Sequence, residues 1–154
     1  MRILIIEDDY EKREKIKLFI FEALGYSSSV DERESLRSGL KALLSGDKYD
    51  LVLLDMSMPN FDIGPDEPGG GTPESFAGKE LMAQMKLRNI VMPVLVITQY
   101  STFDGGSVTL DQLKKEFTDK YKEIFVDIIY YNSAVDCWKK DLETYLHKYT
   151  EGIS

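Results

Sequence analysis

Residues 49–59 read Tyr49-Asp50-Leu51-Val52-Leu53-Leu54-Asp55-Met56-Ser57-Met58-Pro59. The segment carries an uninterrupted apolar run at positions 51–54, and such a run is typical of a strand buried on both faces of a parallel sheet. An acid, Asp55, ends the run. In open α/β sheets ligands bind outside the carboxyl ends of the strands, so this carboxylate is a candidate for chemistry.

Apolar runs of the same kind lie on either side of this segment. They occupy residues 3–6, 94–97, and 124–126 with 128–129, and stretches with apolar residues at intervals of three and four separate them. The segment 26–30 has fewer apolar residues, and we expect it to form an edge strand. Strands that alternate with helices predict an α/β fold: a doubly wound, five-stranded parallel sheet in the order 2-1-3-4-5, with helices on both faces.

Capping signals help to place the later helices. Thr109 with Gln112, and Ser133 with Asp136, have the spacing of a capping box or a close relative of it. The apolar stripes that follow each pair predict two helices that pack on the sheet. Cys137 falls within the second pattern, and we expect it to be a small buried side chain rather than a nucleophile.

The segment 60–74 is rich in glycine and proline, and it is predicted to be an enlarged loop. Thr72 and Pro73 resemble an N-cap and a first-turn proline, so the third helix is expected to begin there and to run to about Arg88. With 154 residues, the chain has the length of one ordinary domain. We expect a single domain over residues 1–150 and a tail over 151–154.

Composition excludes some classes of partner. The chain has 19 basic and 27 acidic residues, for a net charge of −8, and no dense basic stretch. Direct binding to nucleic acid is therefore not expected. The apolar run at residues 3–6 is too short for a signal peptide or a membrane span, which favours a cytoplasmic protein without a membrane partner. The mixed charges of residues 7–14 predict a solvated helix face.

Three acids fall where the predicted sheet brings strand ends together. Glu7 and Asp8 end the first buried strand, and Asp55 ends the third. These two strands are neighbours in the order 2-1-3-4-5. Such carboxylates repel one another, and a hard divalent cation such as Mg²⁺ would relieve the repulsion through oxygen ligands. The alternative is that these acids only solvate loops. The strand-end position favours a cation site.

Three segments together resemble the receiver domain of response regulators: residues 3–9, residues 49–59 and the run 94–97 followed by Thr98. The resemblance implies a flavodoxin-like receiver fold of the CheY-like type with Asp55 as phosphoacceptor. It implies that Glu7, Asp8, Asp55 and the backbone carbonyl of Ser57 bind Mg²⁺, and that Thr98 hydrogen-bonds the phosphoryl group. The Asp55 carboxylate would then attack a phosphodonor in line while the metal neutralises charge.

The chain departs from the family at the end of the fifth strand. The family places a lysine there that pairs with the phosphoacceptor, whereas this region reads Ile128-Ile129-Tyr130-Tyr131-Asn132-Ser133. Tyr131 most nearly takes the lysine position, and it can donate a hydrogen bond but supplies no positive charge. The aromatic that reports phosphorylation in many members falls near Ile128. The receiver is therefore atypical.

Three functions remain open. The first is a stand-alone two-component signalling domain, a phosphoprotein of a phosphorelay, which takes phosphate from a histidine kinase or another phosphodonor and acts through an unknown output protein. In this reading the chain is not an enzyme beyond its own phosphorylation and dephosphorylation. The second is a pseudo-receiver adaptor that works without phosphorylation. The third, a small Mg²⁺-dependent phosphatase, is weaker because Ser57 stands where such enzymes place a second acid.

Overall fold

The computed structural model describes residues 1–59, 76–103 and 106–151. The loop predicted at 60–74, the predicted helix start at Thr72 and Pro73, and the end of the predicted tail lie outside these residues. In chain order the elements are β1 (Arg2–Ile6), α1 (Tyr10–Leu24), β2 (Ser29–Arg33), α2 (Leu36–Leu44), β3 (Leu51–Leu54), α3 (Ala77–Leu87), β4 (Val94–Thr98), β5 (Thr102–Phe103), β6 (Val108–Thr109), α4 (Leu110–Lys120), β7 (Phe125–Tyr130) and α5 (Cys137–Glu151).

The five long strands form one parallel sheet in the order β2-β1-β3-β4-β7. This is the predicted order, with β7 as the fifth long strand, and β2 lies at the edge as expected. In the pairing of β1 with β3, Ile6 stands opposite Leu54, so both strands end at the same level. The residues that follow them, Glu7 and Asp55, therefore emerge side by side.

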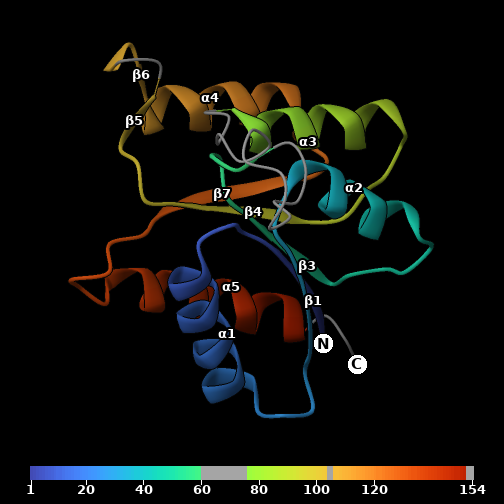
Figure 1. Cartoon of the computed structure of the whole chain (residues 1–154), viewed down its shortest axis with the longest axis vertical. Helices are drawn as coiled ribbons and strands as arrows, with labels where there is room; N and C mark the ends of the chain where they lie inside the picture. The colour runs from blue at the N-terminus through green and yellow to red at the C-terminus, as the bar shows by residue number, and fades with distance from the viewer. Residues whose placement is uncertain (60–75, 104–105, 152–154) are drawn as a thin grey trace, which may run out of the picture.

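Helices cover both faces of the sheet (Figure 1). Alternate residues of β1 point to opposite sides, so Ile3 and Ile5 join one buried cluster while Leu4 and Ile6 join the other. Helices α1 and α5 pack on the first side, and α2, α3 and α4 pack on the second. Burial on both sides explains the uninterrupted apolar runs of β1, β3 and β4 in the sequence.

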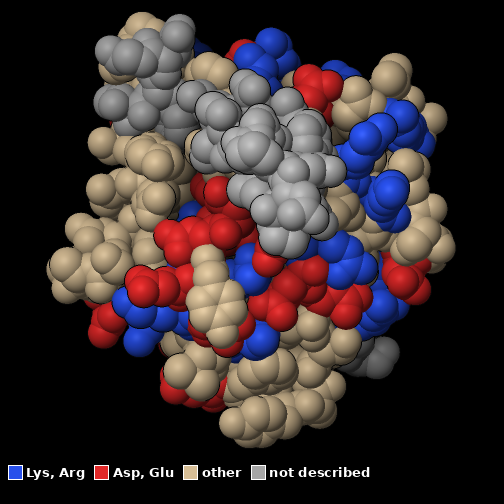
Figure 2. All heavy atoms as spheres, viewed as in Figure 1, with Lys and Arg blue, Asp and Glu red and all other residues tan. Residues whose placement is uncertain are grey.

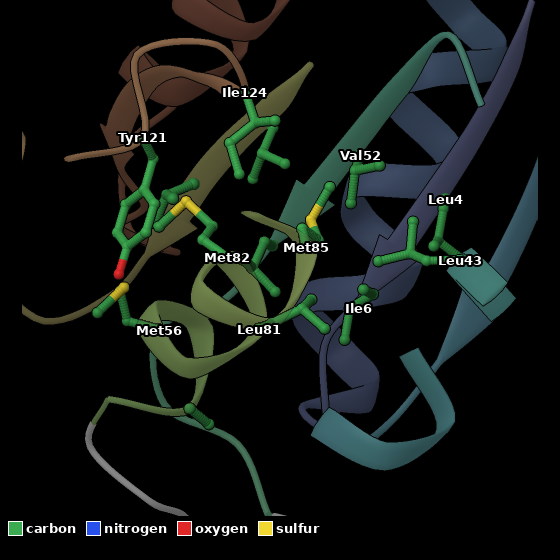
Figure 3. Packing of buried hydrophobic residues seen from close by; sticks show 14 of the residues in the cluster. Leu4, Ile6, Leu43, Val52, Met56, Leu81, Met82, Met85, Tyr121 and Ile124 are labelled. Atoms are coloured by element: carbon green, nitrogen blue, oxygen red, sulfur yellow. The ribbon is translucent and has the colours of Figure 1, made fainter. Parts of the chain in front are cut away.

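Helix α3 packs against the neighbouring strands β1 and β3 on one face of the sheet. Leu81 and Met85 point from α3 toward β1 and β3, where Ile6 and Val52 lie (Figure 3). Each of these side chains is fully buried or nearly so. Burial of an aliphatic side chain contributes about 1.5 to 3 kcal/mol, so this cluster fixes the backbone that leads to Asp55.

Helix caps follow the sequence signals in part. Thr109 and Gln112 form the predicted capping box at the start of α4, and Gly25 ends α1 with a φ of 83°. Helix α5 begins only at Cys137, so Ser133 precedes the helix and is not at the N-cap position that the spacing predicted.

Two sequence predictions about the end of the chain and the second strand were wrong. Cys137 is exposed rather than buried, because α5 begins at this residue and its buried face starts with Trp138. The second strand spans Ser29–Arg33 rather than 26–30, because Arg2 of β1 pairs with Ser29. The long crossover after β4 contains a short antiparallel hairpin, β5 with β6, which the sequence did not predict.

Asp127 on the edge strand β7 ties the two helix layers together. One oxygen forms an ion pair with Lys114 of α4 at 2.9 Å, and the other accepts a hydrogen bond from the Tyr145 hydroxyl of α5. Partial burial acts to raise the pKa of Asp127, but Tyr145 and Lys114 outweigh it and hold the pKa below its ordinary value of 3.8. The ionised carboxylate is therefore favoured in the folded chain.

Asp127→Asn should lower the free energy of unfolding at neutral pH by about 1 to 2 kcal/mol, because it removes charge-assisted contacts to both helices. A carboxyl with a lowered pKa stabilises the fold above its ordinary pKa and loses that contribution as the pH falls through the folded value. The difference between wild type and variant in urea unfolding should therefore shrink below about pH 4. Asp119→Asn on the exposed face of α4 is the control, expected within about 0.5 kcal/mol of wild type. An unchanged stability for Asp127→Asn at pH 7 would contradict the assignment.

Candidate functional site

The carboxyl ends of β1 and β3 bring three acids together. The backbone N–H of Asp55 donates to the carbonyl of Ile6 at 3.1 Å, which continues the sheet by one residue beyond the strands. Glu7, Asp8 and Asp55 each present a carboxylate oxygen, and these oxygens all lie within 4.8 Å of one another. The strand-end argument from the sequence thus predicted a cluster that the fold does assemble.

Asp55 lies at the bottom of this cluster. Its side chain is 3% exposed, and its Oδ1 atom is buried and accepts no hydrogen bond from the described residues. A buried carboxylate oxygen without a hydrogen bond is costly unless another group compensates it. Oδ1 is therefore the atom of this site that has the most to gain from a cation or a covalent partner.

The first turn of α1 brings a basic side chain into the cluster. The Nζ atom of Lys12 lies 2.7 Å from Glu7 Oε2 and 3.3 Å from Asp55 Oδ1, and it donates to the carbonyl of Ile97 at 2.7 Å. Its side chain is 1% exposed. An ammonium group held at these distances compensates part of the charge of the acids.

Arg13, the next residue of α1, anchors the helix beside the same strand end. Its guanidinium donates to the carbonyl of Glu7 at 2.8 Å and pairs with Glu32 and Glu34 at 3.2 and 3.0 Å. Acidic and basic side chains gather across the middle of the face drawn in Figure 2, around the N-terminal end of α1 as labelled in Figure 1. The N-terminus of α1 is thereby fixed against β1 and β2.

Burial and mutual charge shift the pKa values of Glu7, Asp8 and Lys12 in directions that follow from their surroundings. Burial raises the pKa of Glu7 to about 9, with Asp55 acting in the same direction and Lys12 acting against it. Burial and the Asp55 charge also raise the pKa of Asp8. Burial acts to lower the pKa of Lys12, but attraction to Asp55 and Glu7 outweighs it and raises that pKa. The cluster thus favours a charged lysine, and burial with mutual repulsion makes Glu7 and Asp8 harder to ionise than isolated carboxyl groups.

Thr98 and Tyr131 border the site on the side of β4 and β7. Thr98 is fully buried at the end of β4, where its Oγ1 accepts from the N–H of Tyr100 at 3.3 Å and its carbonyl accepts from the N–H of Tyr131 at 2.7 Å. Tyr131 is 3% exposed, and its ring centroid lies 5.6 Å from Lys12 Nζ. The ring of Tyr131 therefore faces the lysine that emerges from α1.

The segment after Asp55 is held by close packing. Ser57 lies between Met56 and Met58, both fully buried. Gly78 donates its N–H to the carbonyl of Met56 at 3.1 Å, and a Cβ on Gly78 would meet the carbonyl oxygen of Asp55 at 2.6 Å. Helix α3 can approach the site this closely only because residue 78 has no side chain.

Lys12 is the residue that the sequence analysis missed. Residues 7–14 were expected to form a solvated face, but Glu7, Lys12 and Arg13 are all buried. The spacing contains a signal for this: Lys12 stands one helical turn before Ile16 and two before Ile20, on the buried stripe of α1. A basic residue at the N-terminal end of an apolar stripe, beside a strand-end acid, is directed into the site.

The residues fit a small divalent cation. Such a cation binds oxygen, and in proteins Mg²⁺ uses one or two carboxylates and retains water. Asp8 is half-buried, Asp55 Oδ1 is compensated only in part, and the oxygens of the cluster are close enough to share one ion. Because a dication would also offset the repulsion among the acids, the donor set suits Mg²⁺.

Fold and site together define a receiver domain, and comparison with known proteins shows that the chain belongs to the response regulator receiver family. It is 31% identical over 144 residues to the Detocs response regulatory protein DtcB of Enterobacter cloacae, with 92% of this chain and 95% of that protein covered. An uncharacterized protein, y4jR of Sinorhizobium fredii, is 30% identical over 143 residues, with 90% and 92% covered. No family model matches the chain.

Solved structures agree with the fold. A CheY-like response regulator receiver domain protein from Methanospirillum hungatei superposes with a TM-score of 0.61 at 23% identity, over 97% of this chain and 94% of that one. The response regulatory domain of protein mrkE from Klebsiella pneumoniae gives a TM-score of 0.63 at 16% identity, over 99% and 97%. At these identities the likeness concerns the fold.

Among the described residues, no helix combines the length and the apolar character needed to cross a membrane.

Gly78→Ala should destabilise the fold by about 1 to 3 kcal/mol, because the new Cβ meets backbone atoms of Asp55 and Met56 that cannot move without displacing the site. At an open helix position the same change would stabilise by up to about 1 kcal/mol. Gly39→Ala in α2 is the matched control: its Cβ meets the side chain of Ile6, which can adjust, so its loss should be smaller. Urea unfolding measures both. A neutral or stabilising Gly78→Ala would show that α3 is not pressed against the site.

Proposed function

We propose that this chain is a phosphoacceptor signalling domain, in which Asp55 accepts a phosphoryl group with the help of Mg²⁺ and the change is read by another protein. The observation that carries the proposal is Asp55 Oδ1: a buried carboxylate oxygen that accepts no hydrogen bond from any described residue and lies among acids that can share a cation. Membership of the response regulator receiver family supports the same function.

Each site residue has a distinct part in this proposal. Asp55 supplies the attacking oxygen, and Asp8, Asp55 and the Ser57 carbonyl bind Mg²⁺ directly, with Glu7 assisting. When bound, Mg²⁺ neutralises charge on the transferring phosphoryl group. Thr98, buried at the end of β4, provides the hydroxyl that hydrogen-bonds the phosphoryl group.

The partners follow from the chemistry. A histidine kinase or another phosphodonor protein supplies the phosphoryl group, and an output protein, not identified by the fold, binds the altered surface in the cytoplasm. The relative DtcB is named as a response regulatory protein, which is consistent with such a role. The tyrosine at the family's lysine position, Tyr131, borders the pocket without contributing charge.

Mg²⁺ should raise the melting temperature of the chain in a concentration-dependent way, because a ligand that binds only the folded state stabilises it. Asp8→Asn should weaken this response by about tenfold in apparent Mg²⁺ affinity, which corresponds to about 1.4 kcal/mol. Glu11→Gln removes an exposed acid from the same part of α1 and should leave the response unchanged. Differential scanning fluorimetry measures the series. Equal Mg²⁺ responses in Asp8→Asn and wild type would contradict the cation site.

Incubation of the purified chain with acetyl phosphate and Mg²⁺ should add one phosphoryl group, measured by intact mass spectrometry. Asp55→Asn should abolish the addition, because an amide lacks the nucleophilic carboxylate. Asp50→Asn, an acid on the opposite end of β3, is the control that should retain it. Addition that survives Asp55→Asn would place the phosphoacceptor elsewhere. A chain that takes up no phosphoryl group under these conditions would favour the phosphorylation-independent adaptor.

A further inference from the structure

We infer that Lys12 is the phosphoryl-binding lysine of this chain, carried by helix α1 instead of by the end of the fifth strand. The inference rests on the proposed function, since it concerns the phosphoryl group on Asp55. In the unmodified chain the Lys12 ammonium pairs with Asp55, and after transfer it contacts an oxygen of the phosphoryl group. The site therefore has its positive charge, although the residue at the expected position is a tyrosine.

The contacts of Lys12 divide into two that hold it and one that it can exchange. Lys12 Nζ forms an ion pair with Glu7 Oε2 at 2.7 Å and donates a hydrogen bond to the Ile97 carbonyl at 2.7 Å, while Asp55 Oδ1 lies 3.3 Å away as an ion-pair partner. The first two have the length of strong hydrogen bonds, whereas the contact with Asp55 is longer. Lys12 is thus anchored by Glu7 and Ile97, and its charge lies beside the reacting carboxylate without a hydrogen bond to it among the described residues.

The surroundings explain how a helix lysine can replace a strand-end lysine. Tyr131, at the strand-end position, is buried, and its ring lies 5.6 Å from the Lys12 ammonium and 5.1 Å from the ring of Trp138. The aromatic face attracts the ammonium and fills the space behind it. Arg13 fixes the same helix turn to the carbonyl of Glu7. Lys12 is therefore positioned from both sides before any phosphoryl group arrives.

The chemical step requires a charge at this place. An oxygen of the Asp55 carboxylate forms a bond to phosphorus while the bond from phosphorus to the donor's oxygen or nitrogen breaks, and the electron pair of that bond leaves with the donor. Negative charge is then spread over the three equatorial oxygens of the transferring group. An ammonium already within 3.3 Å of the attacking carboxylate can stabilise this charge without reorganisation.

A purely structural role is the competing explanation. In that case Lys12 would only balance the charge of Glu7 and Asp55, and its loss would disrupt the pocket as a whole, including its affinity for Mg²⁺. If Lys12 instead serves the phosphoryl group, its removal leaves more uncompensated negative charge for a dication. Mg²⁺ binding would then be retained or strengthened while phosphorylation is lost.

The test compares Lys12→Met and Lys12→Gln with Lys15→Met, a matched charge loss at an exposed position of the same helix. The rate of phosphoryl addition from acetyl phosphate, followed by intact mass at saturating Mg²⁺, should fall about tenfold or more in both Lys12 variants. Lys15→Met should keep the wild-type rate. The Mg²⁺-induced rise in melting temperature should remain in all three variants, which shows that the pocket still folds.

A second arm returns the lysine to the strand end. In the double variant Lys12→Met with Tyr131→Lys, the ammonium enters the pocket from β7, and phosphorylation should recover in part relative to Lys12→Met. A structural counter-ion at α1 would give no such recovery, because the new lysine does not restore the contacts of α1 with Glu7 and Ile97.

The outcomes separate the inference from the proposed function. Wild-type rates in both Lys12 variants would overturn the role of Lys12 and leave Asp55 as phosphoacceptor. Loss of both phosphorylation and the Mg²⁺ response, without recovery in the double variant, would make Lys12 a structural counter-ion and overturn the inference as well. A wild-type chain that accepts no phosphoryl group would overturn the proposed function, and the inference with it.

Discussion

The parallel pairing of β1 with β3 forces acidic side chains into a small buried volume, and the neighbouring residues of the site compensate the charge of these acids. Ile6 and Leu54 stand opposite each other, so Glu7 and Asp55 must emerge together. Unpaired carboxylates in such surroundings would be strongly destabilising. The ammonium of Lys12 compensates part of their charge, at distances of 2.7 Å from Glu7 Oε2 and 3.3 Å from Asp55 Oδ1. Removing either partner of such a buried ion pair would leave an uncompensated charge and strongly destabilise the fold.

Much of the fold could be predicted from the sequence because β1, β3 and β4 are buried on both faces. Runs such as 51–54 have few other structural roles, and alternation with amphipathic segments restricts the topology to a doubly wound sheet. The boundaries were less predictable. Tertiary pairing of Arg2 with Ser29 moved β2 along the chain, and α5 began later than its capping signal indicated. Neither effect has a local signature in the residues concerned.

The residues of the candidate site likewise fall into those that the sequence predicted and one that it did not. Glu7, Asp8 and Asp55 could be predicted to converge because each follows a strand, and strand order alone decides which ends are neighbours. Lys12 could not be found by that argument, since it is on a helix and lies among residues of mixed charge. Only its spacing to Ile16 and Ile20 places it on the buried side of α1. An alignment based on strand ends assigns the lysine position to Tyr131 instead, and the ring of Tyr131 lies next to the Lys12 ammonium.

The position of the lysine also changes what the pocket is mechanically connected to. A lysine at the end of β7 would act on the connection between that strand and α5, whereas Lys12 belongs to the first turn of α1. From Lys12, contacts run to the ring of Tyr131, then to Trp138, and from Trp138 back to Phe19 of α1 at 5.6 Å between ring centroids. These residues lie on the α1 and α5 side of the sheet, opposite α3 and α4. A displacement of the ammonium would therefore act first on the packing of α1 against α5, because close-packed side chains transmit small shifts to their neighbours.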